Sequence, residues 1–92
     1  MAINIVTYDL QQDDSGERYE KLLELIKDGS AWARLGGSSY LIDCEDEPSV
    51  LRDKFKAVLK NGDKLYVGRV SAPAAWIGMP EEVGNWIIKK LS

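Results

Sequence analysis

One carboxylate in this sequence stands where it could do chemistry. Asp9 follows a run of β-branched and aromatic residues at positions 2–8, so it lies at the carboxyl end of a predicted strand. A carboxylate there could be a hard oxygen ligand for Mg²⁺ or Mn²⁺. One aspartate is too few for a metal site, but two copies across a dimer axis could share an ion that polarises a phosphodiester and positions water. The alternative is an aspartate that caps a loop or forms a salt bridge.

Other polar residues offer weaker candidates, because each has an ordinary structural explanation. Asp13 and Asp14 could add metal ligands but are typical of a solvated loop. Arg34 and Arg69 could contact phosphate, although a solvated surface explains them equally well. Gly36-Gly37 is followed by no Walker lysine and predicts a hairpin turn, since both glycines tolerate positive φ.

Composition removes several classes of protein. The chain has 92 residues, which predicts a single domain, and its 45% apolar content is ordinary for a globular protein. It has no histidine, so no imidazole base is available, and a single cysteine allows no internal disulfide, which fits a cytoplasmic protein. No apolar run is long enough to span a membrane. The net charge of −3 argues against strong non-specific binding of nucleic acid.

The elements that would position these residues follow the order β-α-β-β-α-β. Strands are predicted at 2–8, 31–35, 39–44 and 64–70, with helices over 16–28 and from about 46 to Asn61-Gly62. This order predicts a ferredoxin-like α+β fold, an antiparallel sheet with two helices on one face. The core is residues 2–70. An extension, 71–92, adds a short strand at Ala74–Ile77 and a helix that begins near Pro80.

The second face of such a sheet is bare unless something covers it. We expect the helices to cover Ile3, Ile5, Leu65 and Val67. Tyrosines and other apolar residues then point away from the helices, namely Val6, Tyr8, Tyr66, Val70, Tyr40 with Ile42, and Trp32 with Arg34. An exposed apolar patch of this kind marks an interface. A second copy or the C-terminal tail could cover it, and a platform for stacking RNA bases is a further alternative.

Three segments resemble one known family. Ile5-Val-Thr-Tyr-Asp-Leu10 is similar to the first strand of the small CRISPR-associated spacer-acquisition proteins (the second Cas family) and of their SinR-like and VapD-like relatives. The stretches Trp32-Ala-Arg-Leu35 with Ser38-Ser-Tyr40, and Asp63-Lys-Leu-Tyr-Val-Gly68, are similar to later strands of that family. Ala74-Ala-Trp76 looks SinR-like. The basic residues that usually follow the Tyr-Asp motif are replaced by Gln11-Gln-Asp-Asp14.

The resemblance implies a ferredoxin-like homodimer in which a fifth strand, here Ala74–Ile77, adds to the partner's sheet. It also implies that Asp9 is the ligand of a divalent ion near the dimer axis. Members of the family are metal-dependent nucleases, adaptors in integrase complexes or toxin-like ribonucleases. The expected dimer interface comprises Tyr8, Tyr40, Tyr66, Ala74 and Trp76.

Two functions follow as expectations. The first is a non-catalytic interaction or assembly module, a cytoplasmic homodimer that could recruit a protein partner. The alternative is an endonuclease, acting on RNA or DNA, in which Asp9 of both subunits holds Mg²⁺ or Mn²⁺ and Arg34 or Arg69 holds phosphate.

Overall fold

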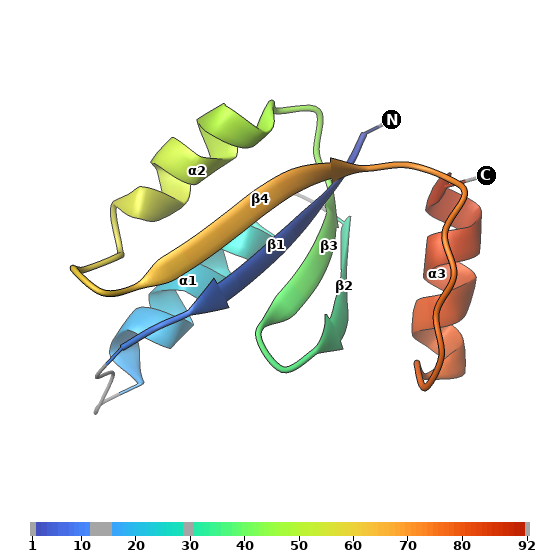
Figure 1. Cartoon of the computed structure of the whole chain (residues 1–92), viewed down its shortest axis with the longest axis horizontal. Coiled ribbons are helices and arrows are strands. Elements are labelled where there is room, and N and C mark those ends of the chain that lie inside the picture. Colours follow the sequence, from blue (N-terminus) through green and yellow to red (C-terminus); the bar gives the residue numbers. More distant parts are fainter. Residues whose placement is uncertain (1, 12–15, 29–30, 92) are drawn as a thin grey trace.

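The computed structural model describes residues 2–11, 16–28 and 31–91, which form an antiparallel sheet and three helices (Figure 1). The α+β class and the order of the elements agree with the sequence prediction. Along the chain the elements are β1 (Ile3–Asp9), α1 (Glu17–Lys27), β2 (Ala31–Gly36), β3 (Ser39–Asp43), α2 (Pro48–Lys56), β4 (Lys64–Val70) and α3 (Glu81–Leu91). The sequence also predicts that Asp14 or Ser15 caps the start of the first helix and that Gly29 ends it, but these three residues lie outside those that the structure describes.

The sheet has the strand order β2-β3-β1-β4, and every neighbouring pair is antiparallel. Val6, in the middle of β1, lies between Tyr40 of β3 and Val67 of β4. The predicted hairpin between β2 and β3 is confirmed, with positive φ angles of 134° at Gly36 and 52° at Gly37. Two strands, β2 and β4, therefore form the edges of the sheet.

One face of the sheet is covered by α1 and α2, and the main core lies beneath them. Leu22 and Ile26 of α1 and Leu51 and Phe55 of α2 are at most 2% exposed. Each pair is spaced by four residues, so it lies on one side of its helix. From the sheet, these helices meet Val6, Tyr8, Tyr40 and Ile42, with Leu65 and Val67 at the margin.

The predicted side-chain directions are correct for β4 but wrong for β1, β2 and β3. Leu65 and Val67 face the helices, as expected. Val6, Tyr8, Tyr40 and Ile42 face them too, whereas Ile3 and Ile5 lie on the opposite face. The reason is the cross-strand register, which places Tyr8 opposite Leu65 and therefore on the same side of the sheet. Trp32 and Arg34 share the helix side, because they pair with Ile42 and Tyr40.

The opposite face is covered in part by α3. Ile87 of this helix is buried against Ile3 and Leu41, and Trp86 and Val83 pack around them. The segment that leads to α3, residues 71–80, has no regular structure and runs alongside that helix (Figure 1). We call it the C-terminal strap. The short strand predicted at Ala74–Ile77 is therefore not formed, because the strap lies next to a helix and not next to a strand.

Two buried polar side chains form hydrogen bonds with the loops at opposite ends of the sheet. The Asn4 amide, 0% exposed, donates to the carbonyl oxygens of Cys44 at 3.1 Å and Asp46 at 3.4 Å. At the far end, the Asp63 carboxylate accepts hydrogen bonds from the backbone of Gln11 and Lys60 and pairs with Arg18. No helix in the described part of the chain is long and apolar enough to cross a membrane.

Candidate functional site

The half of the sheet formed by β1 and β4 is left open on the side that α3 only partly covers. Its surface consists of Ile5 and Thr7 from β1 and Tyr66, Gly68 and Val70 from β4. Tyr66 is 64% exposed, and its ring lies along the sheet so closely that a Cβ on Gly68 would come within 2.9 Å of its Cε1 atom. We call these residues the open face. It is flat and largely apolar, which is typical of a contact surface.

The C-terminal strap, which continues the chain from Val70 of the open face, adds further exposed apolar surface. Every residue from Ser71 to Gly78 is exposed, and Ile77 reaches 95%. Trp76 rests against α3, since a Cβ on Gly84 would lie 3.2 Å from its indole nitrogen. The last turn of α3 is anchored by an ion pair of 2.9 Å between Lys90 Nζ and Asp43 Oδ2. The strap is thus held in place while its apolar residues face water.

Two of the five residues predicted for the dimer interface are not on this surface. Tyr8 is 8% exposed and Tyr40 is 5% exposed, and both pack under α1 and α2. The prediction that these two side chains lie on an exposed face is wrong. Burial raises the pKa of the Tyr8 phenol, as do the nearby Tyr40 and Tyr19, while Arg34 and a hydrogen bond with Ser38 oppose this. The other three, Tyr66, Ala74 and Trp76, are exposed.

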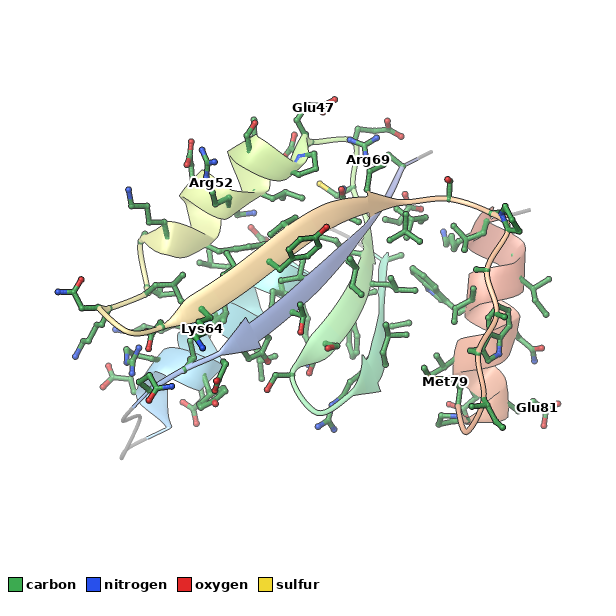
Figure 2. All side chains as sticks on the ribbon, in the orientation of Figure 1. Glu47, Arg52, Lys64, Arg69, Met79 and Glu81 are labelled. Atoms are coloured by element: carbon green, nitrogen blue, oxygen red, sulfur yellow. The ribbon has the colours of Figure 1, made fainter. Side chains whose placement is uncertain are left out.

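Asp9 is exposed at the end of β1, as the sequence predicts. By strand alternation it lies on the same side of the sheet as Thr7 and therefore as the open face. Its cross-strand neighbour is Lys64, a cation, which begins β4 (Figure 2). Within the described residues, no group of three or more acidic, histidine or cysteine side chains could hold a metal ion. Asp13 and Asp14 lie outside those residues. One subunit therefore does not supply a ligand set for Mg²⁺ or Mn²⁺ in the part described.

The two arginines expected to hold phosphate are not brought to Asp9. Arg69 pairs with Asn4, five residues along β4 from Lys64, which places its Cα about 17 Å from that end of the sheet. There it donates to Asn4 Oδ1 and to the Asp46 carbonyl, and it lies beside Glu47, which precedes α2 (Figure 2). Arg34 belongs to the edge strand β2, where its guanidinium donates to the carbonyl oxygen of Gly37.

A groove that the sequence analysis did not single out lies between β2 and α3. It has a volume of about 440 Å³ and is lined by Trp32, Ala33, Arg34, Leu35, Gly36, Pro80, Glu82, Val83 and Trp86. The sequence pattern predicts that Val83, Trp86 and Ile87 form the buried side of the last helix. Ile87 is buried, but Val83 and Trp86 are only half-buried, because they line this groove. The apolar face of the last helix was the one signal available in the sequence.

Comparison with known proteins found no family model that matches this chain and no similar protein among those with curated functions.

Proposed function

We propose that this protein is a non-catalytic interaction or assembly module that forms a homodimer through the open face and the C-terminal strap. The observation that carries this proposal is the exposed apolar surface formed by Tyr66 and the strap, on a sheet whose other face is covered by α1 and α2 over its central strands. Exposed aromatic residues next to flat apolar strands are enriched in protein interfaces. Three of the predicted interface residues, Tyr66, Ala74 and Trp76, belong to this surface.

The strand order supports a ferredoxin-like arrangement for the proposed module. In that arrangement the first and third strands are central and the second and fourth are at the edges, as in β2-β3-β1-β4. The packing of α1 and α2 against the same side also supports it. A relationship to the CRISPR-associated and SinR-like proteins, and a cytoplasmic location, remain part of this proposal and rest on the sequence resemblance.

The experiment measures the mass of the protein in solution by multi-angle light scattering. We expect the wild-type protein to have the mass of two chains. A Tyr66→Asp variant should have the mass of one chain, because the substitution places an unpaired charge in the proposed contact. Val50→Asp is the matched control, since Val50 is 53% exposed but belongs to α2 on the far side of the sheet. A wild-type monomer, or two variants that behave alike, would contradict the proposed interface.

A second candidate function is favoured by the position of Asp9. Because Asp9 and Tyr66 lie on the same side of the sheet, a dimer through the open face could bring two Asp9 carboxylates together. This supports the divalent-metal endonuclease as the alternative. Labelled RNA and DNA should then be cleaved in Mg²⁺ or Mn²⁺ by the wild type and not by Asp9→Asn. Cleavage that survives the substitution, or its absence from both proteins, counts against Asp9 as a catalytic residue.

A further inference from the structure

We propose that the groove between β2 and α3 binds an extended peptide segment of a partner protein, in which apolar residues alternate with acidic ones. The peptide would extend the sheet by pairing with the free edge of β2. This site lies on the opposite edge of the sheet from β4 and does not depend on the proposed dimer.

The first support is the free edge itself. β2 pairs with β3 on one side only, so alternate backbone N–H and C=O groups from Ala31 to Gly36 point away from the sheet. The strand contains no proline or lysine and its alanines are small, so a further strand can pair along Ala31 to Arg34, up to the irregularity between Arg34 and Gly36. Recognition of an extended peptide by such an edge obtains affinity from main-chain hydrogen bonds and specificity from the alternate side chains.

The second support is the wall that α3 builds beside this edge. α3 contacts β2 more than any other strand, and Val83 and Trp86 face the groove together with Leu35. An added strand would place every second side chain against this wall, because side chains alternate between the two faces of a sheet. The wall is apolar apart from Glu82 in the first turn of α3, so these positions of the partner should be apolar.

The third support is the charge on the other side of the edge. Trp32 and Arg34 alternate with the residues that face α3, and both are exposed. Lys27 of α1 lies beside them, with its Nζ atom 4.2 Å from the centre of the Trp32 ring. Two cations therefore border the path of every second partner residue, and an acidic side chain complements them.

The test uses a synthetic peptide of about nine residues in which valine alternates with glutamate, because an edge strand typically has 3–10 residues. Binding is followed by tryptophan fluorescence and by the amide chemical shifts of β2. We expect saturable binding with shifts along β2. A peptide with lysine in place of glutamate, and one of equal composition with its valines in a block, should each bind at least about tenfold more weakly.

Two variants of the protein test the two sides of the groove, the apolar wall formed by α3 and the cations beside β2, independently of each other. Trp86→Ala should weaken binding about tenfold or more by removing the aromatic anchor. Ile88→Ala, on the same helix but facing Ala72 and Trp76, is the matched control and should bind as the wild type does. Arg34→Glu leaves Lys27 beside one new anion, so the lysine peptide should bind this variant more tightly than it binds the wild type. This gain of binding cannot result from unfolding.

Three outcomes would overturn the proposal. The first is the absence of saturable binding by the valine–glutamate peptide. The second is binding that does not respond to the Arg34→Glu charge reversal. The third is a self-associated protein that Trp86→Ala converts to monomers, because the groove would then be occupied by a second copy. Tyr66→Asp should not change peptide binding, so failure of the proposed dimer and failure of the groove remain distinguishable.

Discussion

The two faces of the sheet are built differently. Under α1 and α2, Leu22, Phe55 and Val6 have no exposed surface, and polar groups at the margin, such as Asn4, are hydrogen-bonded. On the other face, the buried cluster is small, with Ile3, Leu41 and Ile87 at its centre, and α3 leaves Ile5 and Val70 only partly buried and Tyr66 exposed. The first face accounts for most of the apolar burial that stabilises the fold. The second keeps apolar surface in water, which is the arrangement expected of a face that meets a partner.

The largest effect on stability should come from truncating a side chain at the centre of the core under α1 and α2. Phe55→Ala should lower the free energy of unfolding by about 3–5 kcal/mol, because it leaves a cavity under a side chain with no exposed surface. Urea unfolding followed by circular dichroism measures this. Val50→Ala on the same helix, at an exposed position, should change stability by less than about 0.5 kcal/mol. Equal effects of the two substitutions would mean that α2 does not seal this face.

A smaller loss of stability is expected for a truncation on the face that α3 covers. Ile87→Ala should cost about 2 kcal/mol, the low end for a buried isoleucine, because α3 covers only part of the sheet and water can reach the gap. Hydrogen exchange should then quicken in α3 while α1 and α2 stay protected. Ile88→Ala, at a site that is 58% exposed, should change neither quantity. If Ile87→Ala unfolds both faces together, the two clusters form a single cooperative core.

The smallest effect should appear only as a dependence on pH. Burial disfavours the charged form of Asp63, but hydrogen bonds from Lys60 and Gln11 and the Arg18 guanidinium outweigh it and lower the pKa of this carboxyl. Because the pKa is lower in the folded state, the contribution to stability is present above the ordinary aspartate pKa of about 3.9 and is lost as the pH falls through the lowered value.

Thermal unfolding of Asp63→Asn measures this contribution. The variant should have a lower Tm than the wild type at pH 7. The difference should begin to shrink below about pH 4, where the carboxyl of the unfolded chain becomes protonated, and should vanish as the pH falls through the lowered pKa of the folded protein. Asp53→Asn is the control, because Asp53 is exposed and pairs only with its exposed neighbour Arg52. A difference in Tm that stays constant down to pH 2 would show that the charge on Asp63 does not stabilise the fold.

The elements could be predicted from local signals, but the directions of their side chains could not. The bounds of β4 agree with the prediction, because the turn at Gly62 separates two clear patterns. In β1 both alternating sets are apolar, with Ile3 and Ile5 against Val6 and Tyr8, so alternation alone does not choose a core side. Asn4 lies on the same side of β1 as Val6 and Tyr8, although its side chain is polar. Its burial is possible because the carbonyl oxygens of Cys44 and Asp46, far away in the sequence, accept its hydrogen bonds.

The candidate site was predictable to a similar degree. The exposure of Asp9 and of Trp76 follows from their places at a strand end and in a segment interrupted by proline. The separation of Asp9 from Arg69 depends on strand register, which is set by contacts far apart in the chain. The groove beside β2 depends on where α3 docks, and no local pattern specifies that position.

The two ends of the described chain meet at the same corner of the molecule. Ala2 and Leu91 line one hollow beside Arg69, and Figure 1 shows both ends at the side opposite the loop between α2 and β4. A short linker between them would close a loop at little entropic cost. A chain of residues 2–91 should therefore tolerate circular permutation, with new ends opened at the Gly36-Gly37 hairpin, and such a rearranged chain would carry fusion partners beside the β2 edge.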